Sequence, residues 1–194
     1  MDKTERMKDG TEATIRRLVQ DDIDKLMECY ASLPDEDRRY LKFDVLDRKV
    51  VAKRLRRVES GEDIRIVAVH GGLIVASGAL ELSGEGWSRH QGEIRVIVAR
   101  PFQHRGLGTI MIRELYFIAV LNQITTIVAR MMRPQAGAQK IFRRLGFHEE
   151  TMLPDFVKDL QGGSQDLIVM TCDMNALWKE LDRTFNESDW QRCR

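Results

Sequence analysis

Between residues 93 and 121 the spacing of apolar residues changes from that of a strand to that of a helix, and this change restricts the fold most strongly. Residues 93–99 are rich in β-branched side chains, which is typical of a strand. A strand that leads through a short loop into a long apolar helix predicts a layered α/β domain, in which the helix packs on a sheet. From Gly106 onward, side chains at the helical spacing are apolar at Ile110, Met111, Leu115, Ile118 and Leu121.

The same two periodicities divide the rest of the chain. We expect strands over residues 14–19, 64–69, 73–82, 93–99, 125–131, 147–153 and 166–172. We expect helices after a cap at Asp21 or Asp22 and over about 44–59, 106–121, 136–145 and 175–186. Gly71 and Gly72 predict a hairpin turn, and residues 83–92 predict a polar loop. This order of elements indicates mixed α/β architecture in one layer-built domain.

A chain of 194 residues favours a single domain. We expect residues 1–11 to be a flexible N-terminus, because they are almost entirely polar, and residues 12–173 to be the folded domain. Residues 174–194 are expected to form an amphipathic helix and a tail. This helix is interpreted as packing on its own domain, and a homodimer contact is the alternative.

Composition excludes several classes of function. Lys and Arg number 31 against 30 Asp and Glu, so the chain lacks the excess of positive charge expected of a nucleic-acid-binding protein. The four histidines do not pair with one another or with cysteine at metal-ligand spacing, and we expect no metal site. They are His70, His90, His104 and His148.

Location is predicted from the cysteines and from the apolar runs. The odd number of cysteines and the lack of a C-x-x-C pair indicate reduced thiols in a cytoplasmic protein. The first ten residues lack the apolar segment of a signal peptide. No apolar run approaches the roughly 20 residues that span a bilayer, so we expect no membrane partner.

The loop Gln103-His104-Arg105-Gly106-Leu107-Gly108 is a candidate for binding phosphate. It enters a helix, whose first N–H groups are unpaired and attract anionic oxygens. Glycines at 106 and 108 let a ligand approach the backbone, and Arg105 adds a cation. The segment is not a P-loop, and Met111 breaks the dinucleotide-binding pattern G-x-G-x-x-G. On the loop alone, a plain glycine-containing turn before a helix remains an alternative.

Two motifs together resemble the GNAT superfamily of acetyl-CoA-dependent N-acetyltransferases. Residues 103–108 match the family's pyrophosphate signature [RQ]-x-x-G-x-[GA], and they follow a strand with Val98 five residues before Gln103. Residues 138–147 (AQKIFRRLGF) look like the family's second motif, A-x-x-x-Y-x-x-x-G-F. The order of helices and strands is also similar, from about residue 12 to 173.

The resemblance implies a mixed, mostly antiparallel sheet that splays into a V between the fourth and fifth expected strands, at 93–99 and 125–131. Acetyl-CoA would be the acyl donor, with its pantetheine arm in this opening and its pyrophosphate on the N–H groups of 104–109. No metal is implied. The residues that the resemblance assigns to the cofactor are Val98, Arg100, Gln103, His104, Arg105, Gly106, Leu107, Gly108, Thr109, Gln135 and Phe142.

The implied reaction is direct attack of a primary amine on the thioester, with a carboxylate as base. Glu93 is the first candidate base, because it opens the strand that leads to Val98, and Glu81 is the second. Phe142 stands where the family often has a Tyr that protonates the thiolate, and Gln135 is an imperfect match to a common Asn.

The acceptor is expected to be the amine of a small molecule, of a protein lysine or of an N-terminus. Residues 35–44 distantly resemble the acceptor side of family members that acetylate protein lysines. A domain that binds acyl-CoA as a sensor or scaffold without turnover is the alternative function.

Overall fold

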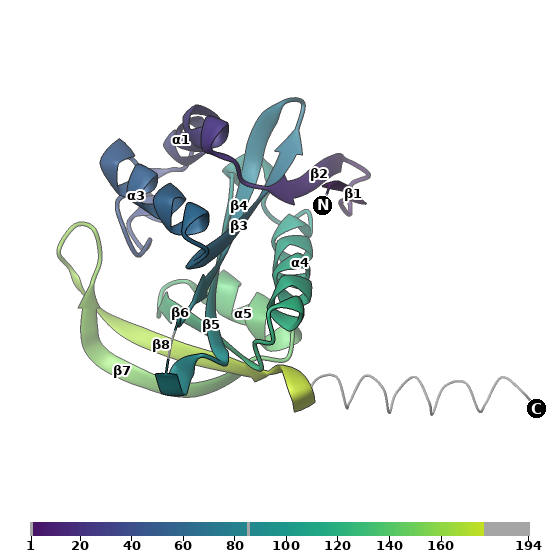
Figure 1. The fold of residues 1–194 in the computed structure, drawn as a ribbon. Helices are drawn as coiled ribbons and strands as arrows, with labels where there is room; N and C mark the ends of the chain where they lie inside the picture. The colour runs from purple at the N-terminus through teal and green to yellow at the C-terminus, as the bar shows by residue number, and fades with distance from the viewer. Residues whose placement is uncertain (1, 85, 177–194) are drawn as a thin grey trace, which may run out of the picture.

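The computed structural model describes residues 2–84 and 86–176, which form one eight-stranded sheet with helices on both faces (Figure 1). The strand order is β1-β2-β3-β4-β5-β6-β8-β7, and every neighbouring pair is antiparallel except β5 with β6. The strands are β1 (Asp2–Arg6), β2 (Glu12–Arg17), β3 (Asp63–His70), β4 (Leu73–Leu82), β5 (Gln91–Val98), β6 (Thr126–Met132), β7 (His148–Lys158) and β8 (Ser164–Asp173).

Helices cover both faces of the sheet, with α1 and α3 on one face and α4 on the other (Figure 1). The helices are α1 (Ile23–Ala31), α2 (Asp35–Arg38), α3 (Arg48–Glu59), α4 (Leu107–Leu121) and α5 (Ala136–Arg144). Successive strand residues point to opposite faces, so Ile66 packs in the core under α4 whereas Val67 packs in the core under α1 and α3. Among the described helices, none is long and apolar enough to cross a membrane.

The sheet opens between β5 and β6. These two strands pair only where Gln91, Gly92 and Glu93 lie beside Thr126, Ile127 and Val128. Beyond that point β5 runs on to Val98 and β6 to Met132 without pairing to each other, whereas each stays paired on its other side. The expected V-shaped opening in a mixed, mostly antiparallel sheet is therefore confirmed.

The N-terminus differs from the expectation. Residues 2–6 form β1, which pairs along its whole length with β2, and Met7 is buried in the core under α4. The sequence gives no sign of this strand because its residues, DKTER, lack apolar alternation; the strand is held as the edge of the sheet by backbone pairing and by ion pairs. Lys3 donates to the buried Glu114 of α4 at 2.8 Å.

Two helix boundaries also differ. The short helix α2 was not expected, and α3 begins at Arg48 rather than near residue 44. The start of α3 is set by Asp47, whose carboxylate accepts from the N–H of Lys49 at 2.8 Å and so caps the helix. The C-terminal helix expected over 175–186, with its alternative of a dimer contact, falls almost entirely on residues outside the described part of the chain.

Candidate active site

The loop after β5 exposes the start of α4 at one end of the V. Gly106 lies at φ 88°, in the left-handed region, and caps the helix. The first helical hydrogen bond runs from the N–H of Ile110 to the carbonyl of Gly106 at 3.1 Å. The N–H groups of Leu107, Gly108 and Thr109 therefore have no carbonyl one turn earlier to bond, which suits them to an anionic ligand.

Gly108 leaves room beside these N–H groups. A Cβ atom at this position would meet only Val98 at 3.8 Å and Ile141 at 4.0 Å, which are ordinary contacts. The protein itself therefore does not require a glycine here. The missing side chain matters to whatever approaches the helix N-terminus from outside, so the residues present fit the pyrophosphate of acetyl-CoA.

Two polar residues of the predicted set, Gln103 and Arg100, bond to other parts of the protein. The side chain of Gln103 donates to the carbonyl of Val98 at 3.1 Å and so ties the loop to the end of β5. Arg100 pairs with Glu36 of α2 at 2.5 Å and lies 3.5 Å from Asp37. Both side chains are therefore engaged within the protein, and α2 fixes the outer edge of the site.

The turn between β1 and β2 packs on the same loop. Arg105 pairs with Asp9 at 2.7 Å, and the N–H of Lys8 donates to the carbonyl of Arg105 at 3.0 Å. The aliphatic part of Lys8 passes 3.4 Å from the position of a Cβ on Gly106. The cation expected at the loop is thus shared with Asp9, and Lys8 supplies a second one that no motif indicated.

A pocket lies in the V and continues under the connector between α2 and α3. Residues 94–97 of β5 and 129–131 of β6 form its two sides, and Gln135, Ala138 and Phe142 close it on the α5 side. The connector contributes Tyr40, Leu41, Lys42, Phe43 and Val45. One pocket therefore joins the predicted cofactor opening to the face of the sheet that α1 and α3 cover.

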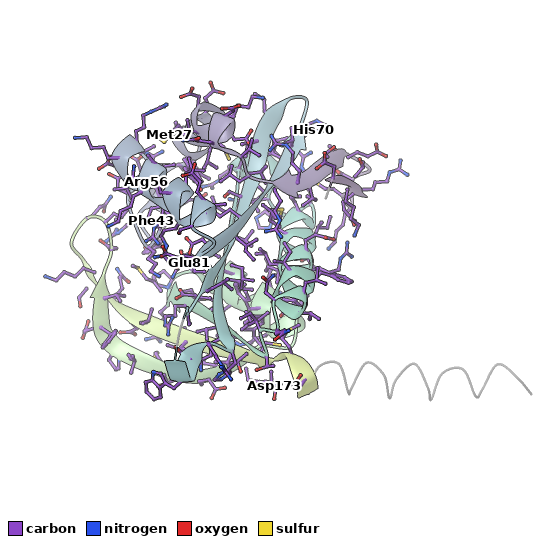
Figure 2. The ribbon with its side chains drawn as sticks, viewed as in Figure 1. Met27, Phe43, Arg56, His70, Glu81 and Asp173 are labelled. Atoms are coloured by element: carbon purple, nitrogen blue, oxygen red, sulfur yellow. The ribbon has the colours of Figure 1, made fainter. Side chains whose placement is uncertain are left out.

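Glu81 and Glu93, the two candidate bases, face each other directly across the β4–β5 pair. Glu93 belongs to the last pair that β5 makes with β6, so it lies at the apex of the V. Glu81 is buried on β4, on the side of the sheet that carries α3 and Phe43 (Figure 2). The structure thus brings both predicted carboxylates to the closed end of the opening.

Cations surround both carboxylates. Glu93 pairs with Arg95, with Arg130 at 2.6 Å and with Lys42 at 3.6 Å. Glu81 lies 3.1 Å from Lys42 and 3.5 Å from Arg54, which itself stacks on the ring of Phe43. Arg65 and Arg95 each reach within 3.7 Å of Glu81.

This crowding shifts the titration of the cluster. Burial alone would raise the pKa of Glu81, but Arg95 and Lys42 outweigh it and hold that pKa below its ordinary value. Burial and the neighbouring arginines lower the pKa of Arg95 to about 10, although Glu81 opposes the change. Burial also lowers the pKa of Lys42. Glu81 is therefore ionised at neutral pH.

Phe142 and Gln135, which the resemblance assigns to the cofactor, line the pocket. The ring of Phe142 is buried and packs edge-on against Phe147, with 4.8 Å between ring centroids. Gln135 accepts from the N–H of Met132 at 2.8 Å, which fixes the turn from β6 into α5. Neither side chain offers an acidic proton.

Sequence reasoning missed much of the site. The connector residue Tyr40 and the buried Tyr30 line the pocket, and the hydroxyl of Tyr30 donates to Ser77 at 3.3 Å. The cations Lys42, Arg65, Arg95 and Arg130 were also missed. The sequence does contain one indication of Arg65 and Arg95, because each lies between two apolar residues of an expected strand. By contrast, the predicted residues His104 and Thr109 are exposed.

The fold and the sequence match known proteins. A sequence model described as the Acetyltransferase (GNAT) family matches residues 23–147. The GNAT domain of Streptomyces lividans PAT, which is 18% identical, superposes over 89% of this chain and 96% of its own with a TM-score of 0.72. The yncA protein of Salmonella typhimurium, whose structure contains its cofactor acetyl-CoA, is 19% identical and covers 84% of this chain and 94% of its own with a TM-score of 0.72.

A third similar structure is the ribosomal-protein-S18-alanine N-acetyltransferase of Escherichia coli. It is 17% identical and has a TM-score of 0.66, with 84% of this chain and 94% of that chain covered. At these identities the structures show the shared fold, and the family model spans well over half of the chain. The chain therefore belongs to the GNAT acetyltransferase family.

Proposed function

We propose that this protein transfers the acetyl group of acetyl-CoA to a primary amine by direct attack. The amine nitrogen bonds to the thioester carbonyl carbon, the C–S bond breaks, and the products are an N-acetylamine and the free thiol of CoA. The observation that carries the proposal is the opening between β5 and β6, which holds a pocket and has the two carboxylates of the Glu81–Glu93 pair at its closed end.

The residues for the acyl donor are those of β5 and of the loop. The backbone of Val98 lies at the edge of β5 that β6 leaves unpaired, and Arg100 follows just after the strand. This backbone would meet the amides of the pantetheine arm, although the carbonyl of Val98 already accepts from Gln103. The N–H groups at the start of α4 would receive the pyrophosphate, together with the Thr109 hydroxyl and the Arg105 and Lys8 cations. His104, which is exposed on the same loop, is the remaining candidate contact.

The proton of the acceptor must leave before the attack, because an alkylammonium has a pKa near about 10.4 and carries no free electron pair. We assign this role to Glu93, acting through a water, with Glu81 as the second candidate. The cations that surround the apex also favour the neutral form of an incoming amine, because like charge lowers the pKa of an ammonium. Phe142 has no proton to give, so the departing thiolate takes its proton from solvent or from another group of the pocket.

The acceptor classes of similar proteins span small molecules and proteins. One similar structure is described as a spermidine N-acetyltransferase and another as an N-acetyltransferase of a ribosomal protein alanine. Both classes remain candidates for this chain on the fold alone.

The donor site is tested by the variant Gly108→Asp with Gly108→Ala as its matched control. Both side chains fit the protein, because a Cβ at residue 108 makes only ordinary contacts. The Asp variant places a carboxylate against the pyrophosphate and should abolish the rise in Tm that acetyl-CoA produces in the wild type. The Ala variant should keep most of this rise. Undiminished acetyl-CoA binding by a folded Gly108→Asp protein would overturn the pyrophosphate assignment.

Turnover is tested by thiol release from acetyl-CoA in the presence of a panel of amines. An active acetyltransferase releases thiol in an amine-dependent way. A protein that binds acetyl-CoA but releases no thiol with any amine would instead be a sensor or scaffold.

A further inference from the structure

The acceptor half of the pocket is lined by charges of one sign. Lys42, Arg65, Arg95 and Arg130 all line the pocket, and no Asp or Glu lines it within the described residues. Glu81 and Glu93 lie behind these cations rather than at the pocket wall. This arrangement presents a positive surface to any molecule that enters beside the thioester.

The carboxylates do not balance this charge. The cluster around Glu81 and Glu93 contains five cationic side chains, because Arg54 also lies 3.5 Å from Glu81. The other four are those that line the pocket, each within ion-pair distance of Glu81 or Glu93. The buried Asp63, which also binds Arg57, lies 3.5 Å from Arg65. Five cations therefore face three carboxylates, and a positive excess remains in a partly buried place, where charge repulsion is poorly screened.

Two arginines that line the pocket each have a buried Nε without a hydrogen-bond partner. Arg65 is 4% exposed, and its Nε donates no hydrogen bond to any described residue. The Nε of Arg95 is likewise buried and unbonded, and it lies 3.7 Å from Oε1 of Glu81, a buried acceptor that also has no hydrogen bond. An unbonded buried donor destabilises the folded state, and native structures retain such groups mainly where they serve a ligand.

We propose that the acceptor is a small primary amine that also carries an anionic oxygen group, a carboxylate in the first place, which Arg65 and Arg95 bind. This inference rests on the proposed function and names the acceptor class for it. A guanidinium presents parallel N–H groups that match a carboxylate or a phosphonate, so one anion satisfies donors on both arginines.

The depth of the arginines favours a small molecule over a protein chain. Arg65 lies on β3 and Tyr30 on α1, both nearly inaccessible, and the connector residues Tyr40 and Phe43 form a wall above them. An anion must pass this wall to reach Arg65. A polyamine or a lysine side chain, in contrast, brings further positive charge to a surface that already has an excess.

The first experiment compares matched amines in the thiol-release assay. Each proteinogenic amino acid is paired with the amine that lacks its carboxylate, and aminoethylphosphonate is paired with ethanolamine. The best amino acid should exceed its decarboxylated partner in kcat/KM by at least about tenfold, the scale of one lost hydrogen bond to a charged group. The phosphonate pair tells whether the site accepts a tetrahedral anion. Equal use of the partners that lack the anionic group, or preference for spermidine, would overturn the proposal.

The second experiment uses Arg95→Gln, with Arg133→Gln as the control. Arg133 is an exposed arginine that pairs with Asp166 and does not line the pocket. Arg95→Gln should raise the KM for the amine with the anionic group about tenfold or more and leave the KM for its partner without that group nearly unchanged. Arg133→Gln should change neither. A loss that is equal for both amines would show that Arg95 is merely structural and would overturn its role.

A third measurement separates this inference from the proposed function. Calorimetric titration of the amino acid panel into the CoA-loaded wild type and Arg95→Gln proteins reports anion binding without turnover. Binding to the wild type that weakens in the variant supports the anion site even if no amine is acetylated. No binding of any amino acid to the wild type would overturn the anion site, whatever the outcome of the thiol-release assay.

Discussion

Glu93 is the first candidate base, and its position and its ion pairs both bear on that role. It lies at the apex of the V, and it is bound by Arg95 and Arg130. These ion pairs fix the position of the carboxylate at the closed end of the opening. A water between Glu93 and the amine allows the proton to leave without breaking these ion pairs.

We expect Glu93→Gln to lower kcat/KM by about 10²-fold, the usual scale for loss of a general base. The affinity for acetyl-CoA should change little, because the loop that receives the pyrophosphate lies at the other end of β5. The defect should shrink as pH rises, since more of the amine is then already neutral. Rates from pH 6 to 9, measured with Tm as a check on folding, provide the test.

The control for this substitution is Glu149→Gln, which removes an exposed carboxylate that pairs with Arg143. It should leave kcat/KM unchanged. Wild-type rates for Glu93→Gln over the whole pH range would remove Glu93 from the mechanism and direct attention to Glu81.

At this scale the sequence predicts residues that follow one another and misses those that meet only in space. The run Gln103–Gly108 is contiguous, and Glu93 was found through its distance from Val98 along one strand. Lys42, Arg65, Arg95 and Arg130 come from three strands and a connector, and only the pairing of strands gathers them. Phe142 was recognised as a departure from the family motif. The hydroxyls of Tyr30 and Tyr40, which line the pocket, were not predicted.

The connector between α2 and α3 shapes the acceptor side, and the turn between β7 and β8 holds it in place. Asp159 of this turn accepts from Arg39 at 2.7 Å and from the N–H of Gly163 at 2.9 Å. The N–H of Leu160 donates to the carbonyl of Arg39 at 3.0 Å. The turn between β7 and β8 thereby holds the connector at Arg39, next to the pocket residue Tyr40.

The ionisation of Asp159 should make the free energy of unfolding depend on pH. Its burial would raise its pKa, but Arg39 and Gln165 bind the ionised form and lower the pKa to about 2. The folded pKa thus lies below the ordinary value of about 3.9, so the stabilisation is present above that pH and is lost as pH falls toward 2. Asp159→Asn should lower the urea midpoint at pH 7. The difference between the urea midpoints of the variant and the wild type should become smaller below pH 4.

The same substitution should raise the KM for the acceptor, because the connector loses its anchor, and should spare the affinity for acetyl-CoA. Asp166→Asn is the control, since Asp166 binds Arg133 and the N–H of Asp155 rather than the connector. An acceptor KM that is unaffected by Asp159→Asn would show that the connector is held by other contacts.

Asp9 of the β1–β2 hairpin pairs with Arg105 and would compete for it with the phosphate of the proposed donor. Asp9→Asn removes this charge, and we expect acetyl-CoA to bind about two- to fivefold more tightly, the scale of one exposed ion pair. The gain should disappear when Arg105→Gln is also present, which a double-mutant cycle by calorimetry measures. Weaker binding by Asp9→Asn would mean that Asp9 holds Arg105 in position.

Elements with clear periodicity were predictable, and those fixed by tertiary contacts were not. The strands at 64–69 and 73–82 and the helix from Gly106 appear close to their expected bounds. In contrast, β1 is polar throughout and depends on its partner β2. The length of a helix also depends on its cap, as Asp47 shows for α3.

The molecule as a whole consists of two half-sheets that meet at a short seam. Strands β1–β5 form one half and β6, β8 and β7 the other, and three residue pairs join them. The helices α4 and α5 pack on the core that both halves share. A donor bound in the V would touch both halves at once, where the strands no longer touch each other.

This seam has a consequence for the opening of the backbone under native conditions. Few hydrogen bonds cross it, so the amide hydrogens of β6 and β8 should exchange with deuterated solvent as one block, faster than those of β3 and β4. Acetyl-CoA should slow the exchange of both blocks together, because release of either half would break its contacts. Protection confined to one block would show that the ligand contacts only one half-sheet.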